Sequence, residues 1–273
     1  MENMTIIDSV DPEILNAVDQ RASEIAQGAS MNGKLAALLA LGSIPIALGA
    51  IAKDVYGQAP ADVVDVLQFA LLLEFLEADF YTRGLASAGM IPAAVQTVFT
   101  QIRDHENAHV VALQGLIGTK GATPRTKPVF DFTAKGNVGG FNFGAAQYST
   151  FLALAQAFED TGVRAYKGQA GRLINDKAVL NAALAIHSVE ARHASMVRRI
   201  RGAKGWITGN SRGDLPAFTQ GIYDGEEVVI QNGVNITTVT GAAENGGSNA
   251  ATESFDEPLT MAQVVAIVTP FLP

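Results

Sequence analysis

A pattern of metal-ligating residue types occurs twice in this 273-residue chain. Each copy has a Glu-x6-Tyr segment followed by a Glu-x2-His segment: Glu74, Tyr81, Glu106 and His109 in the first, and Glu159, Tyr166, Glu190 and His193 in the second. The second copy follows the first at an offset of 84 or 85 positions (159 − 74 and 190 − 106). We therefore expect one helical hairpin to occur twice, because two such hairpins make a four-helix bundle.

Apolar residues recur every three or four positions in four segments of residues 61–202, as on one face of an α-helix. The repeated Glu and His residues interrupt these apolar faces. Residues 118–143 are rich in Gly, Thr, Pro and Lys and have no sustained period, which predicts a long crossover between the second and third helices. The predicted fold is all-α, a four-helix bundle with this crossover.

The bundle is predicted to have an N-terminal helical extension over residues 1–60. Asp11 and Pro12 are typical of a helix start and predict a helix over residues 11–26. The apolar segment 35–52 is short for a membrane span and is interrupted by Gly and Pro, so we expect a buried or interface helix and no stable span. A processed or relict export signal over residues 35–59 is the alternative, although its flank is acidic. The compartment thus stays open between cytoplasm and periplasm or envelope.

Residues 203–273 are predicted to be a C-terminal appendage to the bundle. Asn232-Gly233 is a strong hairpin signal and predicts strands over 227–231 and 234–240. We expect a mobile loop over 242–251 and a short terminal helix over 260–269.

Composition excludes several classes of function. The net charge of −8 and the absence of a basic stripe argue against nucleic-acid binding. The chain has no cysteine, which excludes disulfides, thiolate metal sites and cysteine nucleophiles.

The buried positions predicted for four carboxylates require compensating positive charge. An isolated buried ion costs several kcal/mol, and the apolar faces contain no Lys or Arg, since Arg103, Arg164, Arg192 and Arg198 lie off them. Two divalent cations would neutralise four carboxylates, and mixed carboxylate and imidazole ligation suits iron or manganese.

Each repeated residue has a predicted role. Glu74 and Glu159 are expected to be terminal ligands, Glu106 and Glu190 to bridge two ions, and His109 and His193 to complete one ion each. Tyr81 and Tyr166 are expected to donate hydrogen bonds near the site, although both are also acceptable as core aromatics. His105 and His187 do not fit the repeat and are expected at the surface or behind the ligands.

These motifs resemble the ferritin-like superfamily, in particular the branch of rubrerythrin and bacterioferritin. Residues 65–81 and 255–260 are also similar to ferritin-like proteins related to the plant desiccation-related protein. The chain departs from rubrerythrin in having no CxxC module. Some relatives have an additional carboxylate ligand; here only Glu77 offers one, since Gly162 occupies the matching position, and we do not count it among the ligands.

The resemblance implies a di-iron or di-manganese site, and we expect a di-iron protein that reacts with dioxygen or peroxide, in iron oxidation or stress protection. A manganese-catalase-like peroxide dismutase is the alternative within this chemistry. A structural protein of the envelope or of desiccation stress, stabilised by its metal, is the alternative from another class. We expect a monomer or homodimer, because the two extensions do not suit a 24-subunit cage.

Overall fold

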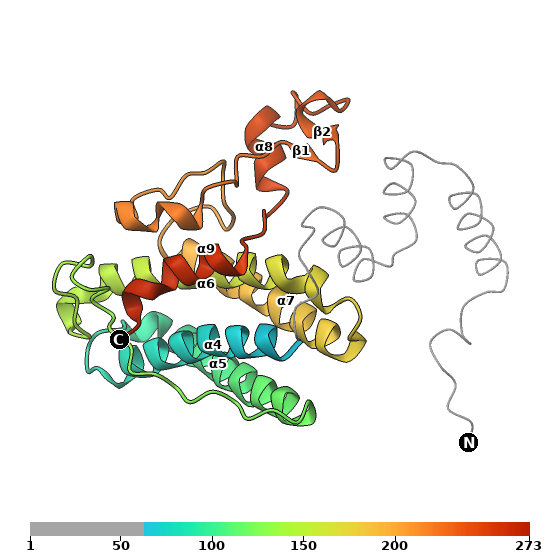
Figure 1. The fold of residues 1–273 in the computed structure, drawn as a ribbon. Coiled ribbons are helices and arrows are strands. Elements are labelled where there is room, and N and C mark those ends of the chain that lie inside the picture. The colour runs from blue at the N-terminus through green and yellow to red at the C-terminus, as the bar shows by residue number, and fades with distance from the viewer. Residues whose placement is uncertain (1–62) are drawn as a thin grey trace, which may run out of the picture.

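The computed structural model describes residues 63–273, and these form a helical bundle with a C-terminal extension (Figure 1). The four long helices are α4 (Val63–Ala86), α5 (Ala93–Thr119), α6 (Tyr148–Ala170) and α7 (Lys177–Ile200). Helix α4 packs along α5, and α6 packs along α7, so the bundle consists of two hairpins. The predicted all-α four-helix fold is confirmed. The helix predicted over 11–26 and the apolar segment 35–52 lie outside the described residues.

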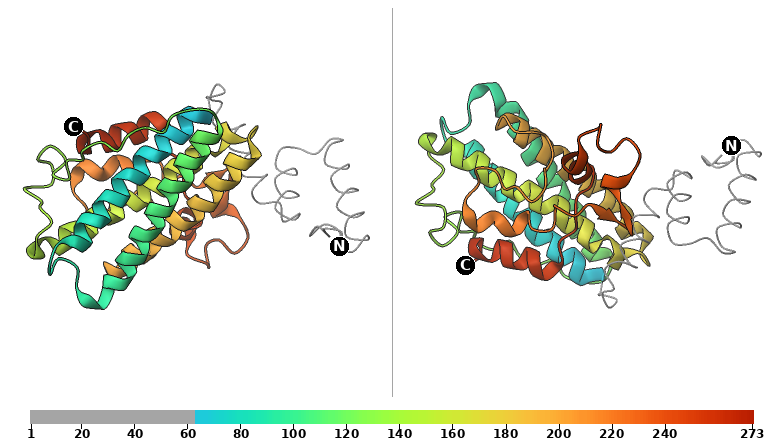
Figure 2. Two further views of the ribbon diagram at one scale, coloured as in Figure 1. Left: turned by 90° about the horizontal axis from the view of Figure 1, so that it is seen from below. Right: turned by 90° about the horizontal axis from the view of Figure 1, so that it is seen from above.

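Helices α4 and α6 are buried on almost every face, whereas α5 and α7 bury one face each. Helix α4 is buried almost continuously from Val66 to Tyr81, and α6 from Phe151 to Tyr166. Such helices are hydrophobic around their circumference because neighbours surround them. Helix α9 (Met261–Val268) supplies part of this cover and lies along the bundle in both views of Figure 2. The metal-ligating residues of α4 and α6 are therefore shielded from both sides.

The crossover between α5 and α6 runs along the bundle, and it contains no helix or strand before the short 3-10 turn Ala145–Gln147, as predicted. Gln68 of α4 anchors it through its side chain, which donates to the carbonyl oxygen of Thr123 (2.7 Å) and accepts from the backbone N–H of Arg125 (2.8 Å). Aromatic side chains of the crossover then pack around Phe80, including Phe132 at 5.3 Å between ring centroids. The crossover thus closes the bundle over α4.

The C-terminal extension differs in part from its prediction. The hairpin is present, with Asn232 and Gly233 at positive φ, but each strand has only two residues, in β1 (Ile230–Gln231) and β2 (Val234–Asn235). Residues 236–238 leave the ladder because the Asn235 side chain accepts from the N–H of Thr237 and starts a 3-10 turn. The terminal helix is present as α9, with a capping box formed by Thr260 and Gln263.

The loop predicted over residues 242–251 is wrong at its end, where α8 (Gly247–Glu253) forms. Two side chains at the end of α8 explain its order. The hydroxyl of Thr252 accepts from the N–H of Gly209 (2.9 Å), and the carboxylate of Glu253 accepts from Lys204 and Thr208 (both 2.5 Å). These contacts are distant in sequence, so local composition did not reveal the helix.

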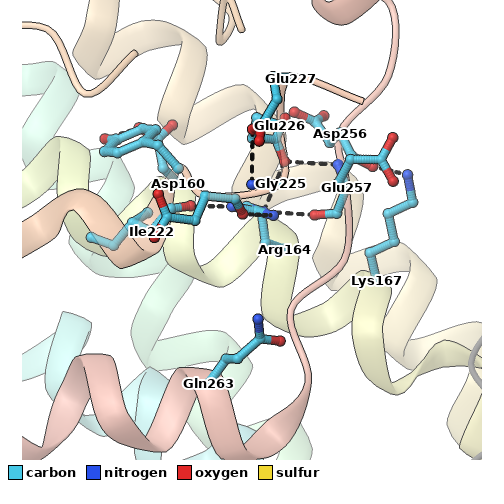
Figure 3. A network of polar contacts seen from close by, with 12 residues as sticks. Asp160, Arg164, Lys167, Ile222, Gly225, Glu226, Glu227, Asp256, Glu257 and Gln263 are labelled. Carbon is cyan, nitrogen blue, oxygen red and sulfur yellow. Dashed lines mark hydrogen bonds and ion pairs between the residues drawn. The ribbon is translucent and has the colours of Figure 1, made fainter. Parts of the chain in front are cut away.

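Buried polar contacts hold the extension to α6 and α7 (Figure 3). The extension is therefore packed more closely against the bundle than the predicted appendage. Arg164 of α6 is only 1% exposed, pairs with Glu226 at 2.8 Å, and donates to the carbonyl oxygens of Ile222, Asp224 and Glu257. Tyr223 donates to Asp160 of α6 (2.7 Å). Since α6 also carries Glu159, the extension packs against and supports one of the helices that supply the metal-ligating residues.

The close approach of the extension to α6 depends on Gly168. A Cβ atom at this position would lie 1.9 Å from the carbonyl oxygen of Leu259. We predict that Gly168→Ala destabilises the protein by about 1–3 kcal/mol, the usual cost of overpacking, because backbone must move. Urea unfolding of the full chain measures this change.

Gly115→Ala is the matched control for Gly168→Ala. Gly115 also lies within a long helix, but a Cβ atom there meets nothing within 4 Å. Alanine should stabilise this site by up to about 1 kcal/mol through helix propensity. Equal stability of Gly168→Ala and the wild type would contradict the requirement for glycine.

Candidate metal centre

Six buried metal-ligating side chains meet in the middle of the bundle. The four glutamates are fully buried, and the two histidines are 8% and 4% exposed: Glu74, Glu106, Glu159, Glu190, His109 and His193. Helices α4 and α6 supply one carboxylate each, while α5 and α7 each supply a carboxylate and an imidazole three residues apart. One helical turn separates such a pair, so both side chains face the same point. The structure brings together all six residues that the repeat predicts as ligands.

The six side chains form two overlapping groups. Glu74 and His109 belong to the first group, Glu159 and His193 belong to the second, and Glu106 and Glu190 belong to both. The possible ligand atoms of each group lie within 4.8 Å of one another. This geometry is compatible with two neighbouring metal ions that share two carboxylates.

Each imidazole presents its Nδ1 atom to three carboxylates. The Nδ1 of His109 lies 3.0 Å from Glu190, 3.1 Å from Glu74 and 3.3 Å from Glu106. The Nδ1 of His193 lies 2.8 Å from Glu106, 3.4 Å from Glu159 and 3.6 Å from Glu190. One ring nitrogen has a single N–H or a single lone pair, so it cannot satisfy three carboxylates at once.

Several of these buried atoms have no hydrogen-bond partner in spite of the short distances. They are both oxygens of Glu190, Oε1 of Glu106, Oε2 of Glu159 and Nδ1 of His193. Buried polar groups without a partner are rare in proteins and call for an explanation such as a bound ion. The donor set, with carboxylate oxygens and imidazole nitrogens but no thiolate, fits iron or manganese. The residues present therefore fit a metal centre.

Burial and mutual repulsion control the ionisation of the cluster. Burial raises the pKa of Glu74 and Glu106, and the negative charge of Glu190 raises both further. Burial opposes ionisation of Glu190 as well, yet its contacts with His109 and His193 lower its pKa to about 2. Burial would lower the pKa of His109, but its carboxylate neighbours raise it to about 12. Protons on the imidazoles can thus supply part of the positive charge that the carboxylates require.

The two repeated tyrosines reach across the bundle to the terminal glutamates. Tyr81 of α4 donates to Oε1 of Glu159 on α6 (2.5 Å), and Tyr166 of α6 donates to Oε1 of Glu74 on α4. Burial, followed by the charge of the accepting glutamate, raises the pKa of each tyrosine, so both remain donors. The contacts expected from sequence are present, and each leaves one oxygen of the glutamate free of the tyrosine.

A seventh carboxylate lies beside the cluster. Glu77 is 3% exposed, and burial followed by the charge of Glu190 raises its pKa well above the ordinary value. Its Oε1 lies 3.4 Å from where a Cβ atom on Gly162 would be. Glu77 is in neither group of candidate ligands. The glycine that replaces a carboxylate in the second half of the repeat leaves room for it.

The two histidines outside the repeat have different surroundings. His105 is half-buried, and its Nδ1 lies 2.9 Å from the Nε2 of His193. His187 lies near Lys167, Asp256 and the backbone of Val163, and burial, followed by the charge of Lys167, lowers its pKa. The repeat gave no signal for the contact of His105, because its equivalent position in the second half, 105 + 84, is Val189.

The buried arginines do not neutralise the cluster. Arg164 pairs with Glu226, and Arg198 of α7 pairs with Asp160. Both side chains point to the interface with the extension, which agrees with their predicted positions off the apolar faces.

No helix within residues 63–273 is long and apolar enough to cross a membrane.

No curated protein matches the chain. The family model of the ferritin-like domain matches residues 62–203, which include all four bundle helices and all six metal-ligating residues. The match covers just over half of the chain, and the protein therefore belongs to the ferritin-like domain family.

Proposed function

We propose that this protein is a di-iron carboxylate protein that reacts with dioxygen or peroxide. The observation that carries the proposal is the pair of overlapping groups of buried carboxylate and imidazole ligands. Two adjacent iron ions would supply two electrons, or accept them, in a single reaction. Iron oxidation or protection against oxidative or desiccation stress is the role that we propose for this chemistry.

The chain would bind the ions with four carboxylates and two imidazoles. Glu106 and Glu190 would bridge the ions, because only these two belong to both groups. Glu74 and Glu159 would be terminal ligands, each oriented by the hydroxyl group of a tyrosine on the opposite hairpin. Four negative charges balance two divalent cations, so the loaded centre would carry no large net charge in the core.

A small apolar cavity lies beside one tyrosine of the centre. A narrow apolar cavity of about 20 Å³ lies between helices α4 to α7, and Tyr166 is part of its wall. This volume holds about one water molecule. The remaining wall includes Leu73, Leu113 and Ala183. None of the six candidate ligands lines this cavity, so it borders the centre only through Tyr166.

The metal content of the protein from its own source tests the proposal first. We expect two iron ions per chain, oxidation of added ferrous iron by dioxygen, or consumption of peroxide. If the protein contains manganese and evolves oxygen rapidly from peroxide, the manganese-catalase-like alternative is favoured over the di-iron proposal. A metal-loaded protein that performs neither reaction but loses much of its melting temperature on chelation would indicate a structural role.

Substitution of the bridging residues should remove both ions. We predict that Glu106→Ala and Glu190→Ala bind neither ion, because each glutamate contributes to both groups. Glu74→Ala and Glu159→Ala should each weaken one ion and keep the other. Metal analysis after equilibration with ferrous iron under anaerobic conditions distinguishes the two patterns.

Glu77→Gln is the control for these variants. This side chain is equally buried beside the cluster but belongs to neither group, so the variant should retain two ions. Full metal content in Glu106→Ala and Glu190→Ala would contradict the proposed site.

Metal binding should release protons, because metal ligands must be deprotonated. The pKa of His109 is raised to about 12 and that of Glu159 to about 7. Burial would lower the pKa of His193, but its neighbouring carboxylates raise it as well. Each histidine therefore releases one proton to solvent when a metal binds below about pH 12, and Glu159 releases a further proton below about pH 7. Affinity should fall as the pH falls, more steeply below pH 7. Calorimetric titration with Mn²⁺, in buffers of different ionisation enthalpy at pH 6 and pH 8, counts the protons; equal and negligible release at both values would contradict this prediction.

A further inference from the structure

His105 makes a contact that distinguishes one half of the metal centre from the other. It precedes Glu106 on α5, and its ring is nearly parallel to that of His193 on α7, with 5.2 Å between centroids and 13° between planes. The Nδ1 of His105 lies 2.9 Å from the Nε2 of His193. The nearly parallel planes and the hydrogen-bond distance place the two rings edge to edge, with these two nitrogens facing each other.

The two nitrogens of His193 face different partners. Nδ1 faces the carboxylates of the cluster, and Nε2 faces His105. A neutral imidazole that binds a metal through Nδ1 carries its proton on Nε2. His193 would then donate this N–H to the Nδ1 of His105. Acceptors behind a histidine ligand fix its tautomer and orientation and raise its basicity.

Within the described residues, the other histidine ligand has no such support. The Nδ1 of His109 also faces three carboxylates. Position 189, which the repeat relates to His105, is valine and offers no acceptor. Among residues 63–273, no side chain makes a hydrogen bond with the Nε2 of His109 that matches the contact between His105 and His193. The two halves of the centre are thus unequal behind their histidines.

We propose that His105 is a positioning residue that makes the two metal sites unequal, so that the ion bound by Glu159 and His193 is held more tightly than the ion bound by Glu74 and His109. This inference rests on the proposed dimetal function. His105 lies outside both ligand groups and acts only through the ring of His193. The protein would therefore fill its two sites in a fixed order.

Stepwise titration of the metal-free full chain with Co²⁺ tests the inference, because the visible spectrum of Co²⁺ reports its ligands. The wild type should bind two ions in two resolved steps. His105→Ala should weaken one step about 10- to 100-fold, the usual effect of removing a partner behind a metal ligand, and shift the spectrum of that ion. His105→Gln should restore part of the affinity, since its amide oxygen can accept the same hydrogen bond.

Single-site backgrounds assign the affected ion. With Glu74→Ala, the remaining site is the one of Glu159 and His193, and addition of His105→Ala should weaken it. With Glu159→Ala, the remaining site is the one of Glu74 and His109, and His105→Ala should leave it unchanged. His187→Ala is the matched control, because this histidine of α7 also lies outside both ligand groups.

The possible failures are distinguishable. If the wild type binds no ion, the proposed dimetal function fails, and the inference fails with it. If two ions bind and His105→Ala weakens both equally or neither, the inference is wrong while the dimetal function stands. Thermal unfolding of each metal-free variant shows whether the fold is intact, and the half-buried position of His105 predicts an intact fold.

Discussion

Mutual repulsion among four buried carboxylates is the constraint on which the rest of this structure depends. Glu74, Glu106, Glu159 and Glu190 have no exposed surface, and none of them pairs with a lysine or arginine in the described chain. Isolated charges in such a position would oppose folding. The two imidazoles, the two tyrosine hydroxyls and the proposed metal ions are the positive or hydrogen-bonding groups that make the cluster compatible with a packed core.

The surrounding structure keeps this cluster in place from outside the bundle. Asp160 and Arg164 follow Glu159 on α6 and connect that helix to α7 and to the extension through Arg198, Tyr223 and Glu226. These contacts use a second set of buried charges, all paired, on a different face of α6 from the cluster. One helix thus separates two electrostatic environments, and its carboxylates have different partners in each.

The sequence predicted the centre well because repetition and helical period agree. Glu74, Glu106 and His109 interrupt apolar faces at helical spacing, and a second copy at the same offset made coincidence a poor explanation. What breaks the repeat was not predictable in this way. His105 contacts a ligand through space alone, and α8 is ordered by Thr252 and Glu253 contacts that no local pattern encodes. The burial of α4 and α6 on almost every face was also not predicted, because a single apolar stripe predicts only one buried face.

The two tyrosines that reach across the bundle make each hairpin depend on the other. Tyr81 orients a glutamate of the second hairpin, and Tyr166 orients a glutamate of the first. The candidate ligand groups are divided in the same way, since the first takes Glu190 from the second hairpin and the second takes Glu106 from the first. Neither hairpin contains a complete coordination site. Bound metal would therefore link the two hairpins, and it could bind only after the hairpins have packed together. The metal content of a sample would then report how much of the protein has this packing.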